Sequence, residues 1–308
     1  KVEKNKLAPD SKSANGRVHA SILDLYDNAR LAQPTKDNMP ISWFGFEYET
    51  KSELEKISAT NKEIVLLTQT FASPSTKSLI DEFKSNYKNV KHITYDSFSE
   101  SAAVNAYESR YGVRGLSNYD FSKSKVIISI GADFLGDWQG GGFDCSYAKS
   151  RIPDNGTMSR HIQFESNMTL SGANADIRVP LKLSEQKLVL IEIYKSIVGN
   201  KIQLKSDISL NKKTKKIVDE LIREIKSAAE GSVIISGIKD EDYQSLVLEI
   251  NEKLNSYSFK PSNTILTRSS DDENISRLIS RMNNGDVGAL IMSGVNPIYS
   301  LPDSKKFS

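Results

Sequence analysis

Short apolar runs alternate with amphipathic stretches over most of the chain. An uninterrupted apolar run of roughly four to eight residues is typical of a buried strand, whereas apolar residues at i, i+3, i+4 and i+7 form one face of a helix. Strands are predicted at residues 63–68, 90–95, 125–130, 160–165, 232–236, 263–267 and 287–292, and helices at residues 73–87, 99–111, 184–197, 217–225, 243–254 and 275–282. This alternation predicts an α/β fold with Rossmann-like parallel sheets and helices on both faces.

The order of these elements suggests two successive units. We expect a first Rossmann-like unit at residues 63–183, and a helical connection with a second unit at residues 184–308. Residues 1–40 are polar and irregular, and we expect an N-terminal arm and packing segment over residues 1–62. A length of 308 residues suits two domains of roughly 100–200 residues each. Because the chain starts at Lys1 and stops just after a candidate loop, we expect a piece of a longer polypeptide, truncated in its second unit.

Charge and cysteine content exclude several classes of function. The 41 basic and 39 acidic residues leave a formal charge of +2, too balanced for an electrostatic nucleic-acid binder. No apolar stretch reaches the roughly 18–20 residues of a membrane helix. Cys145 is the single cysteine, so the chain alone cannot complete a disulfide, an iron–sulfur cluster or a cysteine zinc site. The three histidines are far apart, and we expect Cys145 to be a buried thiol and His161 to make a structural hydrogen bond.

The common catalytic signatures are missing from the sequence. There is no G-x-x-x-x-G-K phosphate loop, no G-x-G-x-x-G after a strand, no G-x-S-x-G and no H-E-x-x-H. We therefore predict no catalytic residue and no metal ligand.

Two loops that directly follow predicted strands are the candidate binding sites. In open α/β sheets, ligands bind beyond the carboxyl ends of the strands. Gly131 and Asp133 follow the strand at 125–130, where glycine permits a close approach of the backbone and the carboxylate can accept hydrogen bonds from a purine or ribose. Gly294 and Asn296 follow the strand at 287–292, where the amide can pair with a base edge. The alternative for both loops is tight-turn chemistry after a buried strand.

Residues 95–183 resemble the molybdopterin oxidoreductase superfamily. The closest branch is the cofactor-free, molybdopterin-like N-terminal part of the iron–sulfur B subunit of bacterial alternative complex III, a quinol-oxidising respiratory complex. The resemblance is carried by residues 129–138 (SIGADFLGDW), 147–151 (YAKSR), 156–166 (GTMSRHIQFES), 169–176 (TLSGANAD), 294–297 (GVNP), 16–20 (GRVHA) and 25–27 (LYD).

In cofactor-bearing relatives, this resemblance implies that two βαβ units each bind half of a bis-guanylate pterin. The loops at Gly131–Asp133 and Gly294–Asn296 would then face the two guanosines. Those enzymes also carry a metal-ligating residue and usually a four-cysteine cluster, which this chain does not have.

Within the closest branch, the resemblance implies a scaffold that is not catalytic on its own inside an oxidoreductase complex. It implies no cofactor in this chain and iron–sulfur clusters in a later part of the same polypeptide. The expected partners are that iron–sulfur domain and other subunits of a membrane complex, including cytochromes, with no nucleic acid and no direct membrane span. The expected location is the periplasmic face of the inner membrane.

Two other functions stay open at this point. One is a fragment of an active molybdenum enzyme that binds molybdopterin guanine dinucleotide. The other is a generic nucleotide-binding enzyme that uses the loop at Gly131. If Trp138 and the glycines at 140–142 pack on a missing half of the protein, Trp138 should be exposed in this chain.

Overall fold

The computed structural model describes residues 2, 3, 7, 16–153, 156–199 and 209–307. The chain forms two compact units, and neither is continuous in sequence. Unit 1 comprises residues 1–19 and 102–265, and unit 2 comprises residues 20–101 and 266–308. Residues 1, 4–6 and 8–15 of the expected N-terminal arm lie outside the described residues.

Unit 1 is built on a four-stranded parallel sheet in the order β8-β7-β6-β9. Its strands are β6 (Val126–Ile130), β7 (Arg160–Glu165), β8 (Ile177–Pro180) and β9 (Ser232–Ser236). Every residue of β6 and β9 is buried, as the uninterrupted apolar runs predict. The predicted parallel sheet with flanking helices is confirmed.

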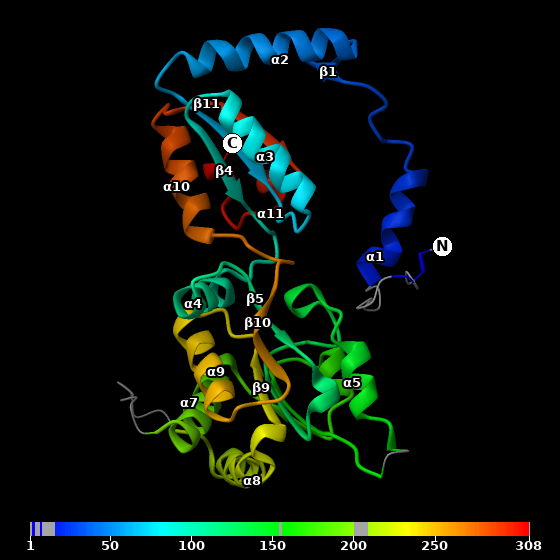
Figure 1. Cartoon of the computed structure of the whole chain (residues 1–308), viewed down its shortest axis with the longest axis vertical. Helices are drawn as coiled ribbons and strands as arrows, with labels where there is room; N and C mark the ends of the chain where they lie inside the picture. Colours follow the sequence, from blue (N-terminus) through cyan, green and yellow to red (C-terminus); the bar gives the residue numbers. More distant parts are fainter. Residues whose placement is uncertain (1, 4–6, 8–15, 154–155, 200–208, 308) are drawn as a thin grey trace. The chain divides into compact units, whose positions relative to one another are not determined.

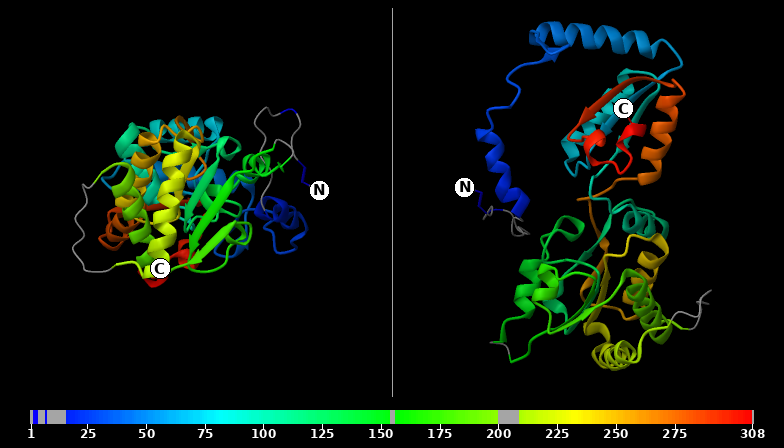
Figure 2. Two further views of the ribbon diagram at one scale, coloured as in Figure 1. Left: turned by 90° about the horizontal axis from the view of Figure 1, so that it is seen from below. Right: turned by 180° about the vertical axis from the view of Figure 1, so that it is seen from behind.

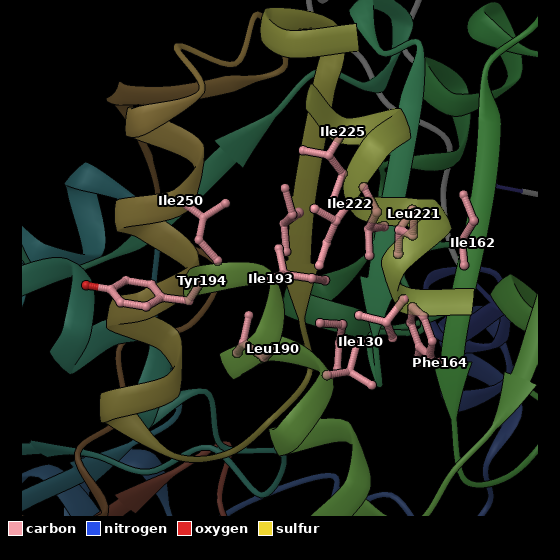
Figure 3. Packing of buried hydrophobic residues seen from close by; sticks show 14 of the residues in the cluster. Ile130, Ile162, Phe164, Leu190, Ile193, Tyr194, Leu221, Ile222, Ile225 and Ile250 are labelled. Atoms are coloured by element: carbon pink, nitrogen blue, oxygen red, sulfur yellow. The ribbon is translucent and has the colours of Figure 1, made fainter. Parts of the chain in front are cut away.

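Three long helices, α7 (Leu183–Ile197), α8 (Lys212–Ala228) and α9 (Glu241–Lys253), contribute to one apolar core of this unit. Figure 3 shows side chains of α7, α8 and α9 around those of β6 and β7. A second core in the same unit is rich in aromatic side chains. Its aromatic members are Tyr119, Phe121, Phe134, Trp138, Phe143, Tyr147 and Phe259.

A short antiparallel pair also belongs to unit 1. It consists of β5 (Leu116–Tyr119) and β10 (Phe259–Ile265), with Phe259 opposite Tyr119. The strand expected at 263–267 is therefore placed four residues too late and pairs antiparallel, outside the parallel sheets. Helix α4 (Ser101–Tyr111) precedes β5, and α5 (Asp144–Ser150) lies between β6 and β7 in sequence.

Unit 2 has a three-stranded parallel sheet in the order β11-β3-β4. The strands are β3 (Glu63–Thr68), β4 (Val90–Thr94) and β11 (Val287–Ser293), and the main helices are α2 (Trp43–Ser58), α3 (Pro74–Asn86) and α10 (Asp272–Asn283). The side chain of Ser73 caps α3 by accepting from the N–H of Thr76, as predicted from the Ser-Pro pair. The colours of Figures 1 and 2 show how far apart these strands are in sequence, because orange-red β11 pairs with light-blue β3.

We expected the two units to meet between residues 183 and 184. The sheets instead assign strands from both sides of that boundary to each unit. Strand β9 was expected in the second unit with β11, but it pairs with β6 in unit 1. Strand β11 instead pairs with β3, near the start of the chain.

The shorter elements are α1 (Gly16–Ala20), η1 (Ser21–Tyr26), β1 (Thr35–Lys36), β2 (Met39–Pro40), η2 (Phe121–Lys123), η3 (Trp138–Gly140), α6 (Leu170–Ala173), η5 (Ala229–Gly231), α11 (Pro297–Ser300) and η6 (Ser304–Lys306).

Candidate functional site

The loop after β6 starts at Gly131, in a conformation that favours glycine. Its φ is +72°, and its N–H donates to the carbonyl of Phe164 on β7 over 2.7 Å. A Cβ at this position would lie 2.6 Å from Oε1 of Gln186. The Gln186 amide is itself held, because its nitrogen donates to Ser166 Oγ and to the carbonyl of Leu181. Both the backbone and its surroundings therefore favour glycine here.

The loop after β9 lies directly against the loop after β6. The N–H of Gly237 donates to the carbonyl of Ile130 over 2.9 Å, and a Cβ on Gly237 would lie 2.1 Å from the carbonyl oxygen of Gly131. The chain continues from β6 to β7 on one side, while β9 joins on the other, so this is the switch point of the sheet. Ligands of open α/β sheets bind at such points. Here the backbones of the two loops are in direct contact, with no side chain between them.

Asp133 is used to hold its own loop. Its Oδ1 accepts hydrogen bonds from the N–H of Ser171 over 2.9 Å and from Ser171 Oγ over 2.8 Å. Its carbonyl accepts from the N–H groups of Gly136 and Trp138. A Cβ on Gly136 would lie 2.2 Å from Oδ2, so that side of the carboxylate is also closely packed. The contact of Asp133 with a nucleotide stays a prediction, and the contact seen is with α6.

Trp138 lies inside the aromatic core and has only 7% of its surface exposed. Its indole Nε1 donates to the carbonyl of Ser236, the last residue of β9, over 3.2 Å. The expectation of an exposed Trp138 is therefore wrong. The physical reason is that the left-handed residues 139–142 turn the chain back, which keeps the ring against Tyr119 and Phe143.

A buried row of polar side chains lies under the same loop. His161, Gln163 and Glu165 alternate along β7 and point to one face of the sheet, as the two-residue period of a strand requires. Nε2 of Gln163 donates to the carbonyl of Ala132 over 3.1 Å and lies 3.3 Å from Glu165 Oε2. The row thus supports the residue between Gly131 and Asp133.

His161 takes part in this row as a neutral imidazole. Its Nε2 lies 3.1 Å from Gln163 Oε1, and its Nδ1 lies 3.2 Å from the hydroxyl of Tyr147. Because the Gln163 amide nitrogen already donates elsewhere, its oxygen accepts, which places the hydrogen on Nε2. Burial lowers the pKa of His161 to about 4. The predicted structural hydrogen bond of His161 is confirmed.

A carboxylate lies at each end of the row. Asp176 contacts the backbone of His161 at one end, and Glu165 is the last member at the other. Burial alone would raise the pKa of Asp176, but hydrogen bonds from Arg151 and from the N–H of His161 hold that pKa below its usual value. Burial opposes ionisation of Glu165 in the same way, and its pKa is lowered by Thr169 and Arg178. Both carboxylates are therefore ionised and paired at neutral pH.

The second candidate loop belongs to unit 2 and follows β11. Gly294 has a φ of +69°, and a Cβ there would lie 2.9 Å from Cδ of Gln69, just after β3. Asn296 is exposed, and its Oδ1 caps α11 by accepting from the N–H of Tyr299 over 3.2 Å. Gly131 and Asp133 are thus brought together in one unit, and Gly294 and Asn296 in the other. Their contact with guanosines stays a prediction.

Some expectations at the site need correction or addition. Cys145 is a free thiol in α5 that is only partly buried, whereas a buried thiol was expected. Among the described residues, no group of three or more His, Cys, Asp or Glu side chains is placed to hold a metal ion. Sequence reasoning missed Ser171 and Gln186. A single glutamine on the otherwise apolar face of the predicted helix was the available signal for Gln186.

Comparison with known proteins bears on the fold. No family model and no curated protein matches the sequence. Among solved structures, acetylene hydratase from Pelobacter acetylenicus matches with a TM-score of 0.53 at 14% identity, over 86% of this chain and 40% of that chain. The formyltransferase/hydrolase complex from Methylorubrum extorquens, in complex with methylofuran, matches with a TM-score of 0.39 at 13% identity, over 80% of this chain and 57% of that chain. The likeness to acetylene hydratase shows the α/β fold with parallel sheets flanked by helices.

Proposed function

We propose that this chain is a non-catalytic, molybdopterin-oxidoreductase-like scaffold domain of a quinol-oxidising respiratory complex of the alternative complex III type. Its two strand-end loops descend from nucleotide-binding loops and now stabilise the domain itself. The sequence resemblance of residues 95–183 supports this proposal. The fold likeness to acetylene hydratase, a molybdopterin-type enzyme, agrees with it at the level of the fold.

The observation that carries the proposal is the engagement of Asp133. In a nucleotide-binding loop, this carboxylate would face the ligand and accept its hydrogen bonds. Here Ser171 donates two hydrogen bonds to Oδ1, and Gly136 packs against Oδ2. Hydrogen bonds to a charged acceptor are strong, so a ligand that used Oδ1 would have to displace these two bonds. A loop held by these hydrogen bonds stabilises the folded domain, which is the role we propose for it.

In this role the domain packs against an iron–sulfur part of the same full-length polypeptide. That part passes electrons from a quinol site toward cytochromes, at the periplasmic face of the inner membrane. No described helix is long and apolar enough to cross a bilayer. The domain contributes shape and a binding surface.

The test is the cofactor content of the full-length protein purified from its native membranes. Molybdenum, tungsten and iron are measured as elements, and pterin is measured by the fluorescence of its oxidised form. Iron without molybdenum, tungsten or pterin is the expected result. One or two pterins per chain would overturn the scaffold role and make the strand-end loops a working cofactor site. A molybdopterin enzyme carried through the same purification controls for cofactor loss.

A further inference from the structure

The end of helix α7 and the start of helix α8 carry a cluster of lysines. Lys215, in the first turn of α8, donates to Glu192 of α7 over 2.8 Å and to Asp219 over 2.8 Å, so the two helix ends are neighbours. Lys195 lies about one turn further along α7, and Lys212 lies about one turn earlier on α8. The lysines outside these ion pairs, which we call the basic cluster, are Lys195, Lys212, Lys213 and Lys216.

The charges of the basic cluster are not neutralised within the described part of the chain. Lys212, Lys213 and Lys216 are exposed, and no ion pair joins a member of the cluster to another described residue. The sequence shows the same imbalance. Residues 195–216 contain seven lysines and one acidic residue, whereas the rest of the chain has 34 basic and 38 acidic residues. Positive charge is therefore concentrated in one stretch of a chain that is slightly acidic elsewhere.

The start of a helix is an unfavourable position for these lysines. Backbone N–H groups give the first turn a partial positive charge, so acidic residues stabilise it and lysines destabilise it. The other two long helices of unit 1 follow this rule, with Glu185 in the first turn of α7, and Glu241 and Asp242 in that of α9. The first turn of α8 has no acidic residue. Residues that break such a local rule are expected where a protein uses them for binding.

The surroundings of the basic cluster decide which kind of partner it fits. Protein interfaces depend on exposed apolar and aromatic anchors, and they favour arginine over lysine. Among the described residues between Leu183 and Tyr257, no large hydrophobic residue is exposed, and the basic cluster contains no arginine. Nucleic-acid surfaces add arginine and aromatic side chains that read the bases or stack on them. Flexible, strongly hydrated ammonium groups without such neighbours suit the headgroups of an anionic bilayer.

We propose that the basic cluster binds the surface of a membrane that contains anionic lipids. The four ammonium groups lie among the lipid phosphates, while α7 and α8 stay outside the bilayer. Each lysine near such a surface adds to binding, so the affinity follows the number of lysines and falls as salt screens them. The proposal goes beyond the scaffold role and does not depend on it, because it concerns only the charges of α7 and α8.

The first experiment measures how much of the full chain sediments with lipid vesicles. One set of vesicles contains phosphatidylcholine with about one third phosphatidylglycerol, and the other contains phosphatidylcholine alone. We expect binding to the anionic vesicles at low salt, little binding at about 0.5 M salt, and none to the neutral vesicles. Equal binding to both sets, or no binding to the anionic set, would overturn the proposal.

The second experiment locates the binding on the chain. Combined Lys212→Gln, Lys213→Gln and Lys216→Gln should weaken binding to the anionic vesicles by about a hundredfold, at about fivefold for each lysine. The melting temperature of this variant should stay the same or rise, because three cations leave the start of a helix. Lost binding is thereby distinguished from lost folding.

The matched control makes the same change of charge in unit 2. Combined Lys77→Gln, Lys84→Gln and Lys88→Gln removes three exposed lysines and should leave binding almost unchanged. If the two triple variants lose binding equally, net charge drives the binding and the basic cluster has no special role, which contradicts the proposal.

Two competitors test the other classes of partner. Polyglutamate represents an acidic protein surface, and a DNA duplex represents nucleic acid, each at the same concentration of charge as the anionic lipid. The chain should stay on the vesicles in both cases. Release of most of the chain by either competitor would assign the basic cluster to that class of partner and would sink the membrane proposal.

Discussion

Three glycines in unit 1, one each after α4, β6 and β9, separate the two reasons why a position excludes a side chain. Gly112 has a φ of +70° with open space around it, Gly131 has a φ of +72° and a near neighbour, and Gly237 meets backbone without a positive φ. We expect Gly112→Ala to cost about 1 kcal/mol of stability, Gly131→Ala about 2 kcal/mol, and Gly237→Ala about 3 kcal/mol or more. Urea unfolding of the three variants measures this order. If Gly131→Ala matches Gly112→Ala, the contact with Gln186 has no energetic weight.

The buried imidazole of His161 makes stability depend on pH. Its folded pKa of about 4 lies below the unfolded value of 6.5. Above pH 6.5 both states are neutral, but between pH 6.5 and 4 the unfolded chain binds a proton that the folded chain does not. The free energy of unfolding should therefore fall by up to about 3 kcal/mol as the pH decreases through this range. Denaturant titrations at several pH values should show this slope reduced in His161→Gln.

His92 provides the control for that experiment. Burial also lowers its pKa, but it is only partly buried, and it lies in the other unit. His92→Gln should therefore change the slope less than His161→Gln. The opposite ranking would contradict the neutral, buried state assigned to His161.

The two tryptophans should differ in fluorescence. Trp138 is buried with its indole N–H bonded to the Ser236 carbonyl, whereas Trp43 has 63% of its surface exposed. In Trp43→Phe, the remaining emission should be blue-shifted and protected from acrylamide. In Trp138→Phe it should be red-shifted and readily quenched. A quenchable signal from Trp138 would mean that residues 139–142 do not hold the ring in the core.

At the scale of elements, one side chain connects the loop after β6 to α6. Ser171 donates both of its hydrogen bonds to Asp133 and also accepts from the N–H of Leu135. Ser171→Ala removes the hydroxyl, and we expect a loss of about 1–3 kcal/mol because a partly buried carboxylate and an N–H lose a partner. Thermal unfolding measures the loss. Ser146→Ala, at a hydroxyl that bonds only the Phe143 carbonyl, is the control and should cost less.

The sequence predicts six of the seven strands of the parallel sheets from their apolar runs, and it misses β8, which is four residues long and has one buried residue. It also fails for β5 and β10. The strand β5 is four residues long and half polar, and β10 contains Pro261, which normally argues against a strand. Pairing of Phe259 with Tyr119 and burial in the aromatic core outweigh these local signals. Helix α2 was also missed, because its aromatic residues Trp43, Phe44 and Phe46 are exposed and Leu54 is its single buried residue, so it has no continuous buried apolar face.

The site shows a similar division between what local pattern can and cannot predict. The turns at Gly131 and Gly294 follow directly from a glycine placed just after an apolar strand. The partner of Asp133 could not be predicted, because Ser171 lies 38 residues later and only the folded sheet brings it close.

At the scale of the whole molecule, strand order is the property that local pattern did not predict. Each strand was assigned to the unit of its sequence neighbours, since consecutive strands are usually adjacent in space. The chain instead leaves unit 2 after α3 and β4, completes the sheet of unit 1, and returns to add β11 beside β3. The apolar runs of β9 and β11 are similar, so their sequences do not reveal which sheet each joins.

This return has a consequence during protein synthesis. When β3 and β4 leave the ribosome, the strand that will lie on the other side of β3 has not yet been made, and all of unit 1 is translated before it. A nascent chain therefore exposes an apolar sheet edge for most of its synthesis, and such edges associate with other chains. We therefore expect β3 to depend on a chaperone, or on rapid folding of unit 1, until translation reaches β11.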